Sequence, residues 1–253
     1  MGVIYTIANQ KGGVAKTTTA VNLSTCLAEM DKKVLLVDID PQGNASSGLG
    51  IDRYSIRQCI YDVLVNEIPI SEVMLKTDIP GLEILPATIQ LAGAEIELAN
   101  SVSREIRLKN ALKVFKEEYD YIFIDCPPSL GLLTLNALTA ADGVIIPIQC
   151  EYYALEGLSQ LMNTISLIQK HLNTQLEISG ILLTMFDART NLAIQVVDEV
   201  KEHFRDKVFR TIIPRNVRLS EAPSHGQPIT RYDKKSKGAQ VYIDLAREVI
   251  EID

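Results

Sequence analysis

Short apolar runs rich in β-branched residues alternate along this chain with longer stretches in which apolar residues recur at helical spacing. The short runs predict strands at residues 3–8, 34–37, 121–124, 144–148, 178–184 and 208–213. The longer stretches predict helices at residues 105–115, 155–171 and 192–204. Strands that alternate with helices pair in parallel through right-handed crossovers. The pattern therefore predicts an α/β fold, a doubly wound and mostly parallel sheet with helices on both faces.

A loop rich in glycine and threonine follows the first apolar run. It reads Lys11-Gly12-Gly13-Val14-Ala15-Lys16-Thr17-Thr18-Thr19. A strand, a glycine turn and a helix start in this order place backbone N–H groups and a helix N-terminus around a phosphate chain. The general pattern G-x-x-x-x-G-K-[ST] is matched only in part, because Gln10 and Ala15 stand where it has glycines. A turn that merely joins strand to helix is the alternative, and the two lysines and three threonines argue against it.

Aspartates follow two of the apolar runs, at the points where strands should end. Asp38 and Asp40 follow the run at 34–37, and Asp125 follows the run at 121–124. Ligands in open α/β sheets bind beyond the carboxyl ends of the strands. A carboxylate there can hold Mg²⁺ directly or through water. Taken alone, each aspartate could equally be a helix cap or a turn residue.

Composition limits the class of protein. The chain has 253 residues, of which 47% are hydrophobic and 23% charged, so we expect one globular domain over residues 1–253. No apolar run reaches the ~18 residues of a membrane helix, and no signal peptide is evident, so the sequence predicts a cytoplasmic protein. The four cysteines form no C-x-x-C pair and are expected to be reduced packing residues rather than metal ligands.

With Lys11 as a second lysine, the loop has the form K-G-G-x-x-K-[ST]-T and closely resembles the deviant Walker A P-loop of the ParA/MinD group of ATPases. Over nearly the whole chain the sequence is similar to bacterial chromosome-partitioning ATPases of the ParA/Soj type. Specific landmarks are Pro86-Ala87-Thr88, Glu151-Tyr152-Tyr153-Ala154-Leu155-Glu156-Gly157 and Pro214-Arg215-Asn216-Val217-Arg218. Short members of this family lack an amino-terminal helix-turn-helix region, and the first run here begins at Val3, so an operator-binding autorepressor is not expected.

The resemblance implies an ATPase that uses ATP and Mg²⁺. Lys16 would neutralise the β/γ oxygens, and Asp40 would orient the attacking water, with Asp38 as a neighbour in the same switch. The metal would be held by Thr17, Asp40 and Asp125. The residues that the resemblance assigns to nucleotide binding are Lys11, Gly12, Gly13, Val14, Ala15, Lys16, Thr17, Thr18, Pro214 and Asn216.

The resemblance also implies an ATP-dependent homodimer, in which Lys11 reaches the nucleotide of the other subunit and the dimer binds duplex DNA without sequence preference. A net charge of −7 argues against DNA binding, because an evenly spread negative charge repels a polyanion. Residues 201–218, however, carry six basic against two acidic residues, a local net of +4. Residues 231–237 add four basic against one acidic, a net of +3. The contacts implied by the resemblance are Arg189 and Arg218, followed by Lys201 and Arg205; solvated surface cations are the alternative.

Three further expectations complete the interpretation. A ParB-type protein would stimulate hydrolysis, and the protein would associate with the nucleoid. Ala15 stands where the family has glycine, so we expect impaired dimer closure or slow hydrolysis, whether the alanine is natural or engineered.

Two other functions are weighed against partitioning. A MinD-like membrane switch needs a basic amphipathic tail, whereas residues 242–253 carry four acids and one base, which predicts a packing helix and no membrane partner. An electron-transfer ATPase like the nitrogenase iron protein needs cluster ligands that Cys126 and Cys150 do not offer.

Overall fold

A seven-stranded sheet runs through the computed structural model, which describes residues 2–151 and 156–252. The strand order is β3-β4-β2-β5-β1-β6-β7, and only the β3–β4 pair is antiparallel. The strands are β1 (Val3–Ile7), β2 (Val34–Asp38), β3 (Leu75–Lys76), β4 (Leu82–Leu85), β5 (Tyr121–Asp125), β6 (Gly143–Gln149) and β7 (Glu177–Thr184). The predicted doubly wound, mostly parallel α/β fold is confirmed.

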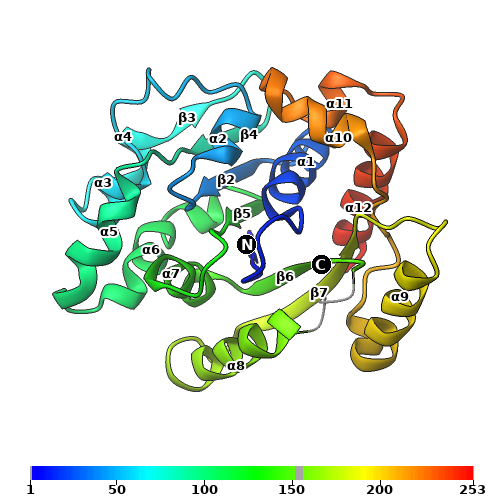
Figure 1. The fold of residues 1–253 in the computed structure, drawn as a ribbon. Coiled ribbons are helices and arrows are strands. Elements are labelled where there is room, and N and C mark those ends of the chain that lie inside the picture. Colours follow the sequence, from blue (N-terminus) through cyan, green and yellow to red (C-terminus); the bar gives the residue numbers. More distant parts are fainter. Residues whose placement is uncertain (1, 152–155, 253) are drawn as a thin grey trace.

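Helices lie on both faces of this sheet (Figure 1). The longer ones are α1 (Lys16–Ala28), α7 (Leu132–Ala140), α8 (Glu156–His171), α9 (Asn191–Phe204) and α12 (Lys237–Ile252). Shorter α-helices are α2 (Asn44–Gly48), α3 (Ile60–Leu64), α4 (Ile70–Val73), α5 (Leu91–Glu97), α6 (Arg107–Leu112), α10 (Val217–Glu221) and α11 (Ile229–Tyr232). Single 3₁₀ turns are η1 (Leu98–Asn100), η2 (Arg104–Ile106), η3 (Phe115–Glu117), η4 (Arg205–Lys207) and η5 (Ala222–His225).

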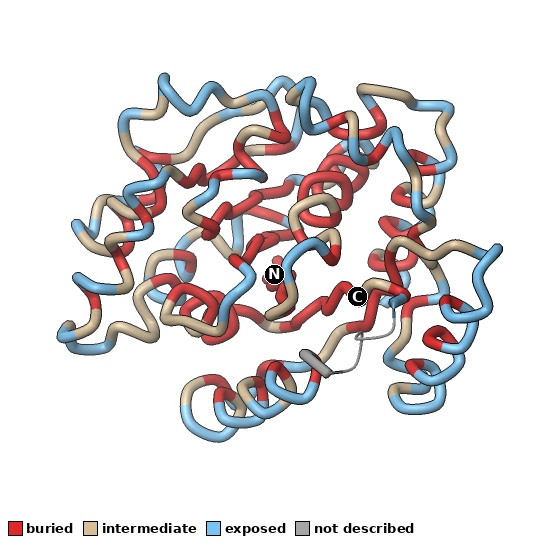
Figure 2. The backbone as a smooth tube through the Cα atoms, viewed as in Figure 1, coloured by how far each residue is buried: buried red, intermediate tan, exposed pale blue. Residues whose placement is uncertain are grey.

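Successive residues of the central strands fill two separate cores, because side chains alternate between the faces of a sheet. In β5, Ile122 packs in the core that contains α7, α8 and α9, whereas Phe123 packs in the core that contains α1 and α12. The Phe123 ring stacks on Tyr5 of β1 with a centroid distance of 5.7 Å. Figure 2 shows the central strands and α1 as the most deeply buried part of the chain. The cores thereby hold the carboxyl ends of β1, β2 and β5 in a fixed arrangement.

Five of the six predicted strands are confirmed, and the strand predicted at 208–213 is wrong. That segment runs beside β7 but makes only isolated bridges. Glu248 of α12 is the reason, because its carboxylate accepts the backbone N–H groups of Arg210 at 2.6 Å and Thr211 at 3.0 Å. These donors are therefore not available to a strand ladder.

The helix predictions hold in two cases and fail in part in the third. The helix predicted at 192–204 corresponds to α9, and the one predicted at 155–171 to α8, although residue 155 lies outside the described residues. The stretch 105–115 is broken into η2, α6 and the start of η3. Residues 152–155 of the quoted landmark are likewise outside the described residues.

The cysteines and the last helix behave as the sequence predicts. Cys26, Cys59, Cys126 and Cys150 are buried and form no disulfide. In α12, Tyr242, Leu245 and Val249 are buried, so this is a packing helix. No helix in the described part of the chain has both the length and the apolar character to cross a bilayer.

Candidate nucleotide-binding site

The loop between β1 and α1 has an unusual backbone conformation. Gly13 has φ of +73° and Ala15 has φ of 67° and ψ of 29°, both in the left-handed region. Glycine adopts this conformation readily, whereas a Cβ disfavours it by about 1–2 kcal/mol. Helix α1 begins at Lys16, directly after this turn, so its first N–H groups lack helical partners and face outward along the helix axis. The loop is thus wound as an anion-binding turn.

Hydrogen bonds within the loop hold its two lysines in different ways. Lys16 is 7% exposed as a residue, and its ammonium donates to the carbonyl of Lys11 at 3.0 Å. The N–H of Lys11 donates to Oδ1 of Asn9 at 2.9 Å. The Lys11 side chain is half-buried and forms no ion pair with the residues that the structure describes. Lys16 is therefore held by the loop itself, whereas the Lys11 side chain remains partly exposed.

Two of the cavities at the N-terminus of α1 adjoin each other. One, of about 340 Å³, is lined by Gly12, Gly13, Ala15, Lys16, Thr17, Thr18, Asp40, Gln42, Asn44, Pro128 and Met185. The other, of about 300 Å³, is lined by Ala15, Thr18, Met185, Ile213, Pro214, Arg215, Asn216, Leu219, Ser220, Pro223 and Tyr242. We call them the phosphate cavity and the base cavity. They share Ala15, Thr18 and Met185, so together they form one elongated site.

A cavity of about 660 Å³ lies elsewhere, among residues that include Ile70 of α4 and Arg107 of α6. None of the loop residues or strand-end aspartates lines it. Because the residues that can carry chemistry surround the smaller pair of cavities, those cavities are the candidate site.

Two buried carboxylates lie side by side at the strand ends. Asp38 and Asp125 are the last residues of β2 and β5 and are register partners. Asp38 accepts three hydrogen bonds, from the N–H of Asp40 at 3.2 Å and from the N–H and hydroxyl of Ser46 at 2.9 and 2.7 Å. Burial nevertheless raises the pKa of Asp38 to about 6. Through the bonds from Ser46, Asp38 holds helix α2 against the sheet. Asp38 is not among the residues that line the phosphate cavity.

Asp125 differs from Asp38 in its hydrogen bonding. Neither of its buried oxygens has a hydrogen bond of normal geometry among the described residues. Burial, and then the neighbouring Asp38 charge, raise the pKa of Asp125 well above its usual value, while the Thr17 hydroxyl favours the charged form. Burial lowers the pKa of Lys16, against the attraction of Asp125.

The donor set around Asp125 fits magnesium. Two orphaned carboxylate oxygens beside a threonine hydroxyl are hard ligands of the kind that Mg²⁺ takes. The described residues contain no group of three or more side chains that could by themselves hold a metal. This agrees with Mg²⁺ chemistry, because that ion keeps several waters and is held by one or two protein groups together with nucleotide phosphates. Thr17 and Asp125 are thus the residues that would hold it.

The structure brings most of the predicted nucleotide residues together. Gly12, Gly13, Ala15, Lys16, Thr17, Thr18 and Asp40 line the phosphate cavity, and Pro214 and Asn216 line the base cavity. Asn216 also caps α10, since its Oδ1 accepts the N–H of Arg218 at 2.8 Å. Two predicted residues, Lys11 and Val14, line neither cavity, and Val14 is buried at 1% exposure.

Sequence reasoning missed several lining residues. Gln42 and Asn44 lie two and four residues after Asp40. Their polar side chains, close behind a strand-end aspartate, were the sequence signal that could have identified them. Met185 is the residue after the apolar run that forms β7. Tyr242 comes from α12, far along the chain, and shares a hydrogen bond of 3.2 Å with Thr19 of α1. No local sequence signal marks Tyr242 as part of a site.

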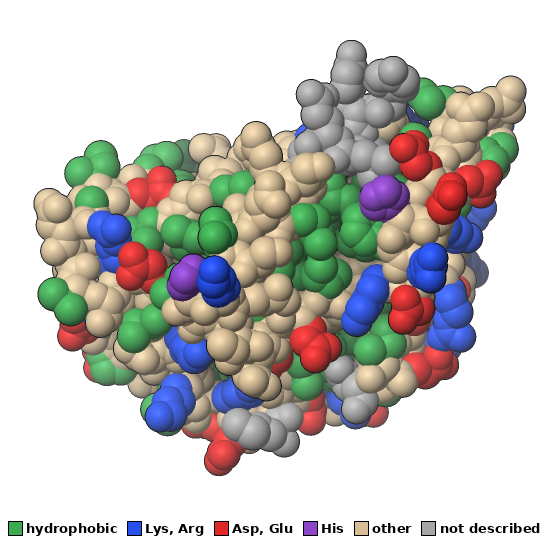
Figure 3. All heavy atoms as spheres, turned by 90° about the horizontal axis from the view of Figure 1, so that it is seen from below, with side chains coloured by type: hydrophobic (Ala, Val, Ile, Leu, Met, Phe, Trp, Pro, Cys, Tyr) green, Lys and Arg blue, Asp and Glu red, His purple; other side chains and the backbone are tan. Residues whose placement is uncertain are grey.

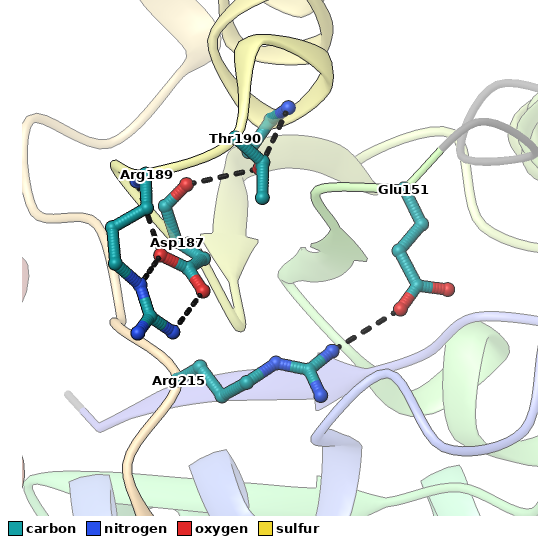
Figure 4. Close-up of polar contacts among 6 residues, drawn as sticks. Glu151, Asp187, Arg189, Thr190 and Arg215 are labelled. Carbon is teal, nitrogen blue, oxygen red and sulfur yellow. Dashed lines mark hydrogen bonds and ion pairs between the residues drawn. The ribbon is translucent and has the colours of Figure 1, made fainter.

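The four predicted DNA contacts come from separate parts of the fold. Arg189 makes a two-pronged contact with Asp187, at 2.9 and 2.7 Å (Figure 4). Arg218 of α10 pairs with Glu221 at 2.9 Å and lies 3.6 Å from Asp233. The other two, Lys201 in α9 and Arg205 in η4, form no ion pair within the described residues, and α9 and α10 lie apart in Figure 1.

The net positive charge counted over residues 201–218 is partly cancelled in the fold. Arg215 donates to Glu151 at 3.2 Å (Figure 4), and Arg210 contacts both Glu248 and Glu251. In the face drawn in Figure 3, Lys and Arg side chains lie among Asp and Glu side chains rather than in a continuous basic surface. The count over residues 201–218 therefore overstates the local positive charge on the surface, because the acidic partners of Arg210 and Arg215 lie outside that segment.

Comparison with known proteins gives four similarities. Residues 2–178 match the family described as AAA domain. The chain is 67% identical over 249 residues to the sporulation initiation inhibitor protein Soj of Bacillus subtilis, covering 98% of each chain. It is 58% identical to the chromosome partitioning protein ParA of Myxococcus xanthus, covering 100% of this chain and 89% of that one. The solved structure of cobyrinic acid a,c-diamide synthase from Mycobacterium smegmatis with bound ADP and magnesium has a TM-score of 0.88 and 40% identity, covering 99% and 95% of the two chains.

Proposed function

Because this chain belongs to the ParA/Soj family of chromosome-partitioning ATPases, we propose that its nucleotide site works as a switch that controls binding to DNA. The chain is an ATPase whose cofactors are ATP and Mg²⁺. One observation carries the assignment of the site. The loop residues Lys16 and Thr17 line a cavity together with Asp40, and the buried carboxylate of Asp125 lies next to Thr17 and Lys16 behind that lining. The proposal includes a single ATPase domain over residues 1–253, since the described strands form one sheet.

We assign a role to each group at the phosphate cavity. The N–H groups of the loop and of the first turn of α1 bind the phosphate oxygens, and Lys16 neutralises the β/γ oxygens. Thr17 and Asp125 hold Mg²⁺, which when bound neutralises charge on the β/γ phosphates. Asp40 lines the same cavity and orients the attacking water. It does so either by a hydrogen bond to that water or as a further residue that helps to hold the metal. Pro214 and Asn216 bind the base.

Dimerisation is the next step of the proposal. The Lys11 side chain is half-buried, lines neither cavity and forms no ion pair among the described residues, and in the proposal it reaches the nucleotide of a second copy. Such a cation, added across the interface, stabilises charge on the transferring phosphoryl group. ATP binding would thereby close a homodimer, and Ala15 at the edge of both cavities would weaken that closure.

DNA binding follows from pairing two copies. With a net charge of −7 and arginines paired to carboxylates, one protomer should bind DNA weakly. Two copies of Arg189 and Arg218 on one dimer double the phosphate contacts, and affinity depends steeply on their number. Lys201 and Arg205 are secondary candidates. The proposal extends to a ParB-type partner that stimulates hydrolysis and to association with the nucleoid.

The experiment measures co-sedimentation with duplex DNA at fixed salt, with MgATP, with MgADP and with EDTA. We expect binding only with MgATP, loss in Arg189→Ala/Arg218→Ala, and retention in Arg247→Ala, which removes an exposed cation of α12. Anionic vesicles replace DNA in a parallel arm. ATP-dependent binding to vesicles instead of DNA would favour the MinD-like alternative, against which the buried apolar face of α12 argues. Equal DNA binding in EDTA would overturn the switch.

A further inference from the structure

A hydrogen bond from a distant strand holds the phosphate-binding loop. Oγ1 of Thr184 donates to the carbonyl of Val14 at 3.1 Å, and both residues are buried. Thr184 is the last residue of β7, 170 positions along the chain from Val14. Among the described residues, no other side chain donates to the carbonyl of Val14.

This bond sets the direction of a peptide group in the loop. In a trans peptide the C=O and the following N–H point to opposite sides. Because the Val14 carbonyl is directed inward to Thr184, the N–H of Ala15 is directed away from Thr184. Ala15 lines both the phosphate and the base cavities. The Thr184 bond therefore presents the Ala15 N–H to the site and keeps a carbonyl dipole, which would repel phosphate, out of it.

Thr184 is itself rigidly placed. It is 0% exposed, it is the register partner of Gln149 in β6, and its carbonyl accepts the N–H of Cys150 at 3.0 Å. The next residue, Met185, has φ of 52° and lines both cavities. The end of β7 thus supplies a wall of the site and an anchor for its loop.

Ala15 makes this anchor more important in this chain. Its left-handed conformation is disfavoured by a Cβ, so the loop has a local tendency to relax toward another conformation. A fixed Val14 carbonyl opposes that relaxation, because rotating the Val14–Ala15 peptide would break the Thr184 bond and leave a buried carbonyl without a partner.

We propose that Thr184 is a positioning residue for nucleotide binding, whose hydroxyl orients the Val14–Ala15 peptide toward the phosphates. The inference rests on the proposed nucleotide site and adds to it a residue outside the loop and its switch aspartates. Thr184 touches neither nucleotide nor metal in this role. It acts through the backbone of the loop.

The test is the dissociation constant for MgADP, measured by calorimetry on three purified full-length variants. Thr184→Val keeps the shape and removes the hydroxyl, and we expect about tenfold weaker binding, the effect of one lost hydrogen bond. Thr184→Ser restores the hydroxyl and should bind within about twofold of the unaltered chain. Thr6→Val is the matched control, because buried Thr6 donates the same kind of bond, at 2.9 Å, to the carbonyl of Ala137. It should leave MgADP binding unchanged.

Steady-state hydrolysis separates positioning from loss of fold. For Thr184→Val we expect KM for ATP to rise about tenfold with kcat within about twofold, because the loop holds the ground state and the transition state alike. In the Ala15→Gly background the same substitution should cost less than about threefold, because the strained residue is gone.

Three outcomes would overturn the inference: equal MgADP affinity in Thr184→Val and the unaltered chain, equal loss in Thr6→Val, or no rescue by Thr184→Ser. If the unaltered chain itself bound no MgADP or MgATP, the nucleotide site of the proposed function would fail instead. The two failures are therefore distinguishable in one set of titrations.

Discussion

Asp38 and Asp125 are register partners at the ends of adjacent parallel strands, yet among the described residues only Asp38 accepts hydrogen bonds of normal geometry. Two carboxylates this deeply buried cannot both be charged at low cost, because each is desolvated and each repels the other. The fold therefore places an electrostatic cost beside the phosphate cavity. A cation bound there removes that cost.

Asp125→Asn should stabilise the protein without nucleotide and abolish its response to magnesium. Removing an unpartnered buried charge should raise Tm at pH 8 by roughly 3–6 °C, or about 1–2 kcal/mol. Thermal melts with and without MgATP check this. Asp142→Asn is the control with the opposite sign, since the Asp142 carboxylate holds Lys116 at 2.6 Å and the Ile4 N–H at 2.9 Å. A lower Tm in Asp125→Asn would contradict the interpretation.

The stability difference between Asp125→Asn and the unaltered chain should depend on pH. A carboxyl group whose pKa is raised in the folded state contributes stability below its unfolded pKa, near 4, and loses it as pH rises through the folded value. For Asp38 that value is about 6, and for Asp125 the shift has the same direction. In EDTA the difference in Tm should therefore be small near pH 4.5 and grow toward pH 8. Saturating MgATP should flatten the trend, and a flat trend in EDTA would refute the explanation.

Ala15→Gly should increase ATP-dependent dimerisation and hydrolysis. The glycine removes both the left-handed strain of about 1–2 kcal/mol and a methyl group at the edge of the two cavities. Light scattering and phosphate release, with and without MgATP, check this. Gly13→Ala isolates the backbone effect, because a Cβ at Gly13 meets no atom within 4 Å but φ is +73°. It should weaken nucleotide binding. If Ala15→Gly behaved like the unaltered chain, Ala15 would have no special role.

Glu248→Ala should destabilise the segment beside β7. The carboxylate accepts two backbone N–H groups, from Arg210 and Thr211, and is almost fully buried. Leaving both donors unsatisfied should cost about 2–4 kcal/mol in the free energy of unfolding, measured by urea denaturation. Glu251→Ala is the control, because among the described residues the ion pair of Glu251 is with the exposed side chain of Arg210. Its effect should stay within about 0.5 kcal/mol.

Asp187→Asn should strengthen DNA binding in the ATP state. Asp187 neutralises Arg189 through two hydrogen bonds, and the pKa of this carboxyl is held well below its usual value by that guanidinium. An asparagine keeps the turn that leads into α9 but frees a full positive charge on each protomer. We expect about a three- to tenfold gain in affinity at low salt and a steeper salt dependence. No change would indicate that Arg189 does not contact phosphate.

Local sequence patterns predicted those parts of the molecule that depend on neighbouring residues. The buried strands at 34–37 and 121–124 and the loop that contains Lys16 each combine an apolar run with a polar end, and the structure places them at one edge of the sheet. No such pattern predicted the hydrogen bond from Ser46 to Asp38. The order of the strands in the sheet was not predicted either.

Features that depend on contacts between residues far apart in the chain could not be predicted from local sequence patterns. The strand expected at 208–213 failed because Glu248, 38 residues away from Arg210, takes its donors. The basic character of the same segment was overstated because Glu151 lies 64 residues from Arg215. The short strands β3 and β4 have too few residues for a period to be recognised.

The last helix has a consequence for biosynthesis. Tyr242 forms part of the base cavity and Glu248 fixes the segment that leads to Pro214, so residues of α12 complete a pocket whose loop is synthesised more than 200 residues earlier. A nascent chain on the ribosome exposes its phosphate-binding turn early but cannot finish the cleft until α12 has been made. Nucleotide capture is thereby delayed until that helix has packed.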